Sequence, residues 1–458
     1  MDSINSSGIK QNVLVFCRFY LVPDFRKNVA PLDGEFKFSF LTDGYSPGTE
    51  DTRKAYYASL KRGVLCDELT PEDEREVMTR CRLLRNLTPD RRRAMMHAIA
   101  VTLATNLDKV QPAAVLCHLV DDYVTHILFI LAARRGIRTI GYFASYFPGY
   151  VQLTDNTDGR ALLIREPSDD EVQDVGRAVS NLVFRQNYGQ NDSYTFGRHI
   201  YRVMRYMTKR IVFPIKSVIR RDPFNSHYLQ TPFVAERRYI SDYPFKSHFH
   251  NNWRQEIERL RTRRAGPVYY FPLGYVPESS TDYWIDNLSV IDYEKKVIEI
   301  LQVLGRDGIV LVKEHMHMMG ARSTHFYRAI KAIDGVVSVY PLEYSNNVLQ
   351  ESDAVVMGGG SIGIEATLRG KPVFTFCRAA FWFTPSRATW LDLDGVELWP
   401  EQIADLLRRF VPLSDTERAN FIRDCLRTMV QRRTGGSRWP LIEPDDLRRA
   451  LMQRVRQS

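Results

Sequence analysis

The stretch Asp353-Ala-Val-Val-Met-Gly-Gly-Gly-Ser-Ile-Gly-Ile-Glu-Ala-Thr-Leu-Arg-Gly-Lys-Pro-Val373 decides the fold of the second half of the chain. Its apolar run Ala354–Met357 predicts a buried strand, and three glycines then make a turn. Residues Ser361–Arg369 fit a helix that Gly370 closes, and Pro372–Phe376 fits the next strand. A strand, a helix and another strand at this spacing indicate one unit of a parallel sheet.

The same alternation extends to both sides of this stretch. Further strands are predicted at Val268–Phe271, Ile309–Lys313 and Val336–Val339, and helices at Tyr293–Leu304, Ser323–Ile333, Asn346–Gln350 and Pro400–Phe410. Elements that alternate in this way predict a parallel sheet with helices on both faces.

The N-terminal half carries a weaker form of the same pattern. Asn12–Cys17 reads as a buried strand. Further on, strand Ala113–Cys117, helix Val124–Arg135 and strand Ile137–Ile140 form one right-handed crossover. We therefore predict an α/β chain with a parallel sheet in each half.

A chain of 458 residues exceeds one ordinary core and predicts two domains. We place an N-terminal acceptor lobe at 1–200 and a basic linker or insertion at 201–265. A C-terminal donor lobe follows at 266–437, and a helix at 438–458 is expected to pack back on the N-terminal lobe.

Composition excludes several classes of protein. With 44% hydrophobic and 26% charged residues the chain is globular rather than disordered. It contains no apolar run long enough to span a membrane, and the polar N-terminus lacks a secretory signal. The six scattered cysteines favour reduced core thiols. We expect a cytoplasmic protein, with a position peripheral to the inner membrane as the alternative.

The net charge of +9 is concentrated partly in the segment 202–221, where basic and apolar residues interleave. Three interpretations stay open: a linker with a solvated face, an amphipathic surface on anionic lipid, or an acceptor groove. No nucleic-acid-binding module is recognisable, so nucleic acid is not expected as a partner.

The glycine turn is the strongest chemical signal. Gly358, Gly359 and Gly360 allow close approach of a ligand to the backbone, and Ser361 can cap the helix or donate to a phosphate oxygen. Glu365, one helical turn later, can reach ribose hydroxyls. The alternative is a plain tight turn in which Glu365 pairs with Arg369 on the same helix. The pattern is neither a Walker loop nor a dinucleotide fingerprint.

A second group of polar residues follows the strand Ile309–Lys313, at the sheet edge where ligands bind in open α/β sheets. Lys313 can neutralise phosphate, His315 can bind phosphate or a base edge, and Arg322 can clamp phosphate with two hydrogen bonds. The alternative is a local Lys313–Glu314 pair with His315 bonded within its loop.

Metal binding is a weaker hypothesis at this edge. His317 and His325 lack the cysteines or carboxylates that a metal site needs. We therefore expect no metal and no cofactor.

Two further regions offer candidate residues. Glu278, Ser279 and Ser280 lie in the loop after the strand Val268–Phe271 and can cap a helix or bind sugar hydroxyls.

In the N-terminal lobe, His118, Asp121 and Asp122 follow a strand, and Asp43 lies in another loop. A transferase needs a general base for its acceptor hydroxyl, and Asp121 or Asp122 is the candidate. The alternative for Asp122 is to cap the helix that begins near Val124.

At these motifs the sequence resembles a known family. Lys313-Glu-His315, Gly320-x-Arg322 and Phe326-Tyr-Arg328 resemble the KEHP…GxR…FYR block of bacterial capsule and surface-polysaccharide biosynthesis proteins. Ser352–Val373 resembles their SDAVV…G…G.EA…GKPV block, and Tyr270-Phe-Pro-Leu…Pro277-Glu278 is similar to their FPLHYQPE segment. Met316 stands where the family has proline.

The resemblance implies a GT-B fold, in which two Rossmann-like lobes have parallel sheets that face a central cleft. The C-terminal lobe then holds the activated sugar and the nucleotide-sugar donor is the substrate, without an obligatory metal. The resemblance also implies that His315 contacts the nucleotide phosphate. The predicted function is transfer of a sugar from a nucleotide donor, bound by Lys313, Glu314, His315, Arg322, the Gly358–Glu365 turn and Glu278, to a surface or capsular glycan. A nucleotide-sugar 2-epimerase, a CDP-alcohol phosphotransferase and a non-catalytic nucleotide- or glycan-binding protein stay as alternatives.

Overall fold

The computed structural model describes residues 10–145, 147, 149–155, 160–180, 197–198, 200–201, 203–205, 207–208, 211–212, 215, 252–276, 279–315, 318, 322–378, 387–433, 437 and 439–455. The chain divides into two compact units. Unit 1 comprises Met1–Val175 and Ile422–Ser458, and unit 2 comprises Gly176–Phe421. The boundaries fall inside two helices, α6 (Asp169–Ser180) and α16 (Asp415–Arg427).

Unit 1 is built on a sheet with a parallel centre. Its strands are β1 (Gln11–Cys17), β2 (Phe36–Thr42), β3 (Glu50–Asp51), β4 (Ala114–Cys117), β5 (Arg138–Ala144), β6 (Tyr150–Asp155), β7 (Arg160–Ala161) and β14 (Met429–Gln431). The order is β14-β6-β5-β4-β1-β2-β3, with β7 paired to β6. The five strands from β5 to β3 run parallel, whereas β6 pairs antiparallel with β5, β7 and β14.

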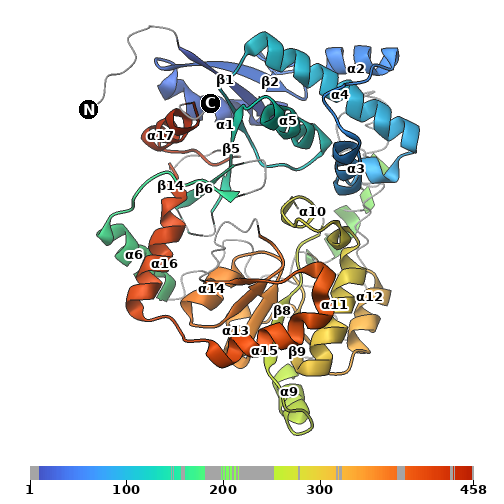
Figure 1. The fold of residues 1–458 in the computed structure, drawn as a ribbon, viewed down its shortest axis with the longest axis vertical. Coiled ribbons are helices and arrows are strands. Elements are labelled where there is room, and N and C mark those ends of the chain that lie inside the picture. Colours follow the sequence, from blue (N-terminus) through green and yellow to red (C-terminus); the bar gives the residue numbers. More distant parts are fainter. Residues whose placement is uncertain are drawn as a thin grey trace. The chain divides into compact units, whose positions relative to one another are not determined.

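Helices cover both faces of this sheet (Figure 1). They are α1 (Val22–Val29), α2 (Arg53–Arg62), α3 (Pro71–Arg80), α4 (Pro89–Val110), α5 (Tyr123–Arg134) and α17 (Pro444–Val455). Short 3-10 turns are η1 (Phe19–Leu21), η2 (Ala30–Leu32) and η3 (Leu84–Asn86). Because strand side chains alternate, Val13 and Val15 point to one face and Leu14 and Phe16 to the other. All four are buried.

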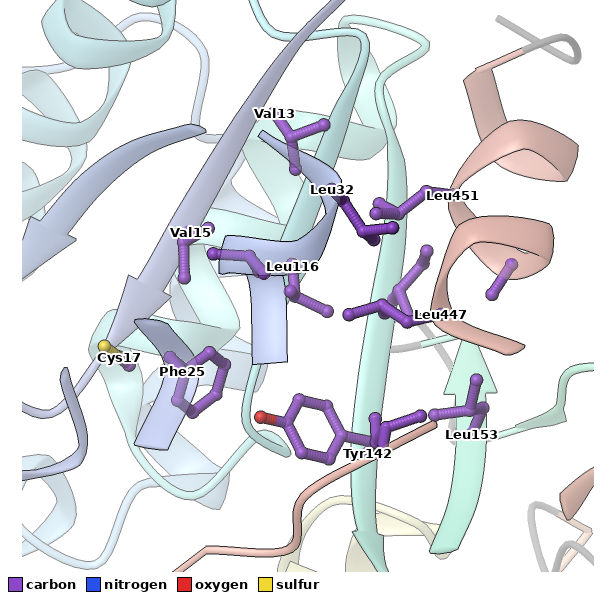
Figure 2. Close-up of a cluster of buried hydrophobic side chains, with 14 of the residues drawn as sticks. Val13, Val15, Cys17, Phe25, Leu32, Leu116, Tyr142, Leu153, Leu447 and Leu451 are labelled. Carbon is purple, nitrogen blue, oxygen red and sulfur yellow. The ribbon is translucent and has the colours of Figure 1, made fainter. Parts of the chain in front are cut away.

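On one face of this sheet, the hydrophobic core contains residues from near both ends of the chain. Leu447 and Leu451 of α17 pack with Val13, Leu116 and Tyr142 of the sheet (Figure 2). Fully burying one such leucine contributes about 1.5 to 3 kcal/mol, so this C-terminal helix is part of the unit rather than an appendage.

Unit 2 is built on a wholly parallel sheet. Its strands are β8 (Val268–Pro272), β9 (Ile309–Lys313), β10 (Val336–Val339), β11 (Ala354–Met357), β12 (Val373–Thr375) and β13 (Thr389–Trp390), in the order β10-β9-β8-β11-β12-β13. The helices are α9 (Trp253–Arg261), α10 (Ser279–Asp282), α11 (Tyr293–Asp307), α12 (Thr324–Lys331), α13 (Ser345–Glu351), α14 (Ile362–Leu368) and α15 (Trp399–Arg409), with 3-10 turns η6 (Leu288–Ile291) and η8 (Leu393–Leu398).

Neighbouring tyrosines on β8 show which helices lie on which face. The Tyr269 hydroxyl donates to Asp307 at the end of α11, whereas the Tyr270 ring lies on the side of Ser345 in α13. The helices α11 and α12 therefore cover one face, and α13 and α14 the other (Figure 1).

The predicted fold class, an α/β chain with two Rossmann-like lobes, is confirmed. In both units the strand order places the first strand centrally, with the second and third on one side and the fourth, fifth and sixth on the other. The predicted strands Ile309–Lys313, Val336–Val339 and Ala354–Met357 are observed with the same bounds. The central cleft of the GT-B expectation stays a prediction.

The unit boundaries differ from the predicted domain limits. Helix α9 falls in the predicted linker 201–265, but its Trp253 and Ile257 are buried and it packs beside β9 and β10 in unit 2. Similarly, β14 pairs with β6 and returns the chain to unit 1 before the predicted limit at 438. The basic composition of 201–265 suggested a linker. Helix α9 nevertheless has an apolar face, which is buried against the sheet of unit 2.

Candidate functional site

In unit 2, the loops after β8 and β11 meet where the strand order reverses, between the first and the fourth strand. Open α/β sheets bind ligands in the crevice at this switch point, outside the carboxyl ends of the strands. The glycine turn directly follows β11, and Lys313 is the last residue of β9, on the other side of β8.

The glycine turn is fixed on one side and open on the other. The Thr375 hydroxyl donates to the carbonyl of Gly358 at 2.9 Å, and a β-carbon on Gly358 would lie 2.8 Å from the Phe376 ring. Gly360 has a φ of +119°, which only glycine adopts readily. Gly359 is different, because it is exposed and a β-carbon there would meet nothing within 4 Å.

The backbone of this turn offers hydrogen-bond donors. In a trans peptide the N–H points opposite to the C=O, so the Gly359 amide is directed away from buried Thr375. The amides of Gly359 and Gly360 donate to no residue within the described part of the chain. Successive unpaired amides of this kind form an anion-binding concavity. Helix α14 has only seven residues, so the predicted contribution of a helix N-terminus is small.

Lys313 places a positive charge at the same edge of the sheet as the turn. The side chain is 9% exposed, and its ammonium makes no hydrogen bond or ion pair with any described residue. Burial lowers the pKa of Lys313 to about 8, although the carboxylates of Glu314, Glu343 and Glu365 favour the charged form. A buried cation without a partner is costly for the fold and favours an anionic ligand.

Glu365 interacts with both Lys313 and the end of the turn. The Ser361 hydroxyl donates to its Oε1 at 3.3 Å, and no side-chain hydrogen bond from Ser361 caps α14. Desolvation raises the pKa of Glu365 to about 7, opposed by the Ser361 hydrogen bond and by Arg369 and Lys313. The cluster therefore holds a weakly ionised carboxyl next to an unpaired ammonium.

Glu314 and Arg322 form a buried pair that holds the loops. Arg322 Nε donates to Glu314 Oε2 at 2.8 Å, and the two side chains are 2% and 0% exposed. Glu314 also accepts from the Tyr327 hydroxyl at 2.8 Å, and Arg322 donates to the Gly274 carbonyl. These contacts join the loops after β8 and β9. Arg322 thus supports the site, and its phosphate contact stays a prediction.

The remaining predicted donor residues are only partly described. His315 is half-buried, and its ring lies 5.4 Å from the ring of Tyr275. Its backbone N–H donates to Glu314 Oε1 at 2.7 Å, which fixes the main chain at this point. Glu278, Met316 and His317 lie outside the described residues.

In unit 1 the corresponding switch point, between β1 and β4, is occupied by a charge cluster centred on Arg18, a residue that the sequence analysis missed. Arg18 directly follows β1 and is 8% exposed. Its guanidinium donates to Asp43 at 2.8 Å and to Asp121 and Asp122 at 2.9 Å each. The only signal in the sequence was its place after a predicted strand.

The three candidates for the base have different surroundings. Asp122 is 0% exposed, and its Oδ1 accepts from the backbone N–H of Val124 and Thr125. It is therefore the N-cap of α5, the alternative that the sequence offered. Asp121 is 40% exposed, and His118 Nε2 lies 3.4 Å from its Oδ1.

The ionisation of Asp121 follows from its partners. Burial raises its pKa, but Arg18 and His118 together hold the pKa well below the usual range. Asp121 is thus a carboxylate that reaches solvent beside the buried imidazole of His118. Asp121 and His118 both stay candidates for the base. The Asp122 carboxylate is already engaged by the N-terminus of α5 and by Arg18.

The basic segment is described only in part. Met204, Met207, Ile211 and Ile215 are 52% to 66% exposed, whereas most of the basic residues between 202 and 221 lie outside the described residues. A lipid surface at this segment stays a prediction. No helix among the described residues is long and apolar enough to cross a membrane. All six cysteines are buried and free of disulfides.

Comparison with known proteins gives weak structural similarity. No protein-family model matches this chain, and no curated protein matches its sequence. Similar solved structures include the UDP-GlcNAc 2-epimerase of Neisseria meningitidis, at TM-score 0.24 and 11% identity over 91% of this chain and 97% of that one. A β-Kdo 2,7 transferase of Thermosulfurimonas dismutans has TM-score 0.33 and 10% identity over 84% and 97%. A glycosyltransferase of Rickettsia africae has TM-score 0.28 and 9% identity over 98% of both chains. At such scores we transfer no residue role or reaction from these proteins.

Proposed function

We propose that this chain is a glycosyltransferase that uses a nucleotide-activated sugar, and that unit 2 holds the phosphates of the donor at Lys313 and the Gly358–Ser361 turn. The single observation that carries the proposal is the buried ammonium of Lys313, which has no partner among the described residues, beside unpaired glycine amides. A nucleoside diphosphate supplies the missing negative charge and accepts the amide hydrogen bonds.

The same groups suit the chemistry of the leaving nucleotide. Sugar transfer releases a phosphate that gains negative charge in the transition state, and fixed donors in a dry site stabilise that charge. Lys313 and the turn amides can perform this task without a divalent ion. Glu365 lies next to them and can accept from a ribose hydroxyl when it is ionised.

Unit 1 would supply the base for the acceptor. His118 lies beside Asp121, and either side chain can accept a proton from an acceptor hydroxyl, while Arg18 keeps Asp121 ionised. A surface or capsular glycan as acceptor follows from the motif resemblance alone. Without an acceptor, conversion of the donor to its epimer would assign the chain to the 2-epimerases instead.

The test is thermal stabilisation of the purified chain by UDP, GDP, CDP, CMP and ADP, each with and without EDTA. Ligand at about 100 times its dissociation constant adds roughly 2.7 kcal/mol to stability, a clear shift of the melting temperature. We expect one nucleotide to stabilise the wild type irrespective of EDTA. Lys313→Met should remove most of the shift, and His315→Ala should reduce it.

The matched control is Lys295→Met, on the exposed side of α11, which should bind like the wild type. If no nucleotide shifts the wild type, or if Lys313→Met binds equally well, the phosphate site is wrong. A shift that disappears with EDTA would contradict the metal-independent mechanism.

A further inference from the structure

A pocket of about 300 Å³ opens at the carboxyl ends of β12 and β13 in unit 2, beyond the glycine turn. It is lined by Asp286, Asn287, Phe376, Arg378, Trp390, Asp392 and Leu393. Its volume is at the lower limit for small-molecule sites, which suits one ring rather than a whole nucleotide.

The pocket adjoins the proposed phosphate site through one side chain. Phe376 lines the pocket, and its ring edge is the group 2.8 Å from the β-carbon position of Gly358. The Phe376 ring is held in place by stacking on Trp399, with 6.1 Å between ring centroids. A ligand with phosphates on the turn can therefore place its next group in this pocket.

The walls are rigid and carry polar groups. Asn287 donates to Asp394 at 2.8 Å and accepts from the Ser289 N–H at 2.9 Å, so its side chain is fixed. Asp392 accepts from the Asp394 N–H through Oδ1 only, and the backbone carbonyl of Asp392 accepts from the Trp399 indole at 2.8 Å.

Arg378 and Trp390 form the aromatic side of the pocket. The Arg378 guanidinium lies 3.5 Å from the centroid of the Trp390 ring and makes no ion pair within the described ranges. Stacking leaves the guanidinium N–H groups at its edge able to donate.

The charge balance defines the ligand. The lining carries two carboxylates, Asp286 and Asp392, and one cation, Arg378. Carboxylates accept hydrogen bonds from hydroxyl groups and repel further negative charge, and an aromatic wall packs against the apolar face of a sugar ring. A phosphate or a uronic acid would add negative charge to a pocket that already has an excess.

We propose that this pocket holds the sugar of the donor and selects an uncharged hexose over a uronic acid. The inference rests on the proposed function, because the nucleotide anchors the sugar. It assigns Asp392 and Trp390 to sugar specificity and leaves nucleotide affinity to Lys313 and the turn.

The experiment is calorimetric titration of the wild type with UDP, UDP-glucose and UDP-glucuronate, and with GDP and GDP-mannose. For the base that binds, we expect the hexose conjugate to bind more tightly than the bare diphosphate. Trp390→Ala and Asp392→Asn should each weaken binding of the hexose conjugate roughly tenfold and leave the affinity for the bare diphosphate unchanged. For Asp392 this is about the effect of a lost hydrogen bond to a charged group. If UDP is the base, UDP-glucuronate should bind roughly tenfold more weakly than UDP-glucose, and Asp392→Asn should narrow the gap.

Glu397→Gln is the matched control, because Glu397 lies in the same 3-10 helix η8 but outside the pocket. If Trp390→Ala or Asp392→Asn weakens diphosphate binding itself, the pocket holds the base and the inference is wrong. Equal binding of glucose and glucuronate conjugates overturns the selectivity. If no nucleotide binds the wild type, the proposed function fails, and the inference fails with it.

Discussion

The carboxyl edges of the two sheets share a strand order but differ in how a buried positive charge is paired. In unit 1, Arg18 is buried at the end of β1 and three carboxylates surround it. In unit 2, Lys313 is buried at the end of β9 and has no partner among the residues described. Arg18 is thus neutralised by carboxylates of the fold, whereas the charge of Lys313 can be neutralised by a bound ligand.

This difference separates a structural cluster from a binding site. Two buried positive charges at equivalent edges look alike in sequence, because each follows an apolar strand. A buried ion pair changes stability little, whereas an unpaired buried charge lowers the free energy of unfolding. The comparison therefore predicts opposite signs for the removal of each charge.

The largest expected effect is on stability, from removal of Arg18. Arg18→Met leaves Asp43 and Asp122 as buried charges without their cation, and we expect a loss of about 3 to 5 kcal/mol in the free energy of unfolding. Lys313→Met removes a buried charge that makes no ion pair with a described residue and should raise stability by about 1 to 3 kcal/mol. Urea denaturation of both variants measures the contrast. Equal destabilisation by the two substitutions would contradict the distinction between the sites.

A smaller effect is expected on ligand affinity, from Gly359→Ala. The added methyl group meets no protein atom but occupies the space where a phosphate would contact the backbone. Nucleotide affinity should fall roughly tenfold to a hundredfold, about 1.4 to 2.8 kcal/mol. Stability should stay within about 0.5 kcal/mol of the wild type.

Gly34→Ala in unit 1 is the control, because Gly34 is also free of neighbours and lacks a positive φ. It should change neither affinity nor stability. Wild-type affinity in Gly359→Ala would show that ligands do not approach this turn closely.

The smallest expected effect is the pH dependence of stability from Glu365. Its pKa is raised to about 7 in the fold from a usual value of 4.5, so the fold favours the protonated carboxyl. That contribution is complete below pH 4.5 and is lost as the pH rises through about 7. Glu365→Gln should flatten the profile of urea midpoints in this range, and Glu401→Gln on the exposed side of α15 should not. If Glu365→Gln leaves the pH profile of the urea midpoints unchanged, the Glu365 carboxyl is exposed to water and its pKa is not raised by burial.

Nucleotide binding should also lose strength with pH. The pKa of Lys313 is lowered to about 8, so its ammonium loses its proton at pH values where an ordinary lysine keeps it. Affinity should decline above pH 8, and the decline should be absent from the residual binding of Lys313→Met. Bound phosphate favours the ammonium and shifts the onset of the decline upwards.

Sequence periodicity was enough to predict the parallel sheet of unit 2 and the place of its glycine turn. Apolar runs of four or five residues, such as Ala354–Met357, fit only a strand covered on both faces, and Gly358–Gly360 could end it only as a turn. The N-cap at Asp122 was also within reach of the sequence, because an aspartate precedes an apolar helix there. The roles of Arg18 and Arg322 were not, because both depend on carboxylates far away in the chain or across a loop.

By itself, then, the sequence determined which residues form strands, turns and caps, since these depend on neighbours within a few positions. It also placed Lys313 and the glycine turn at the carboxyl ends of strands. Only the tertiary structure decided which charges are neutralised, because Arg18 meets Asp43 and Asp121 through contacts 25 and 103 residues apart. The distinction between a satisfied cluster and an open site is therefore a property of packing, where burial decides the cost of every unpaired charge.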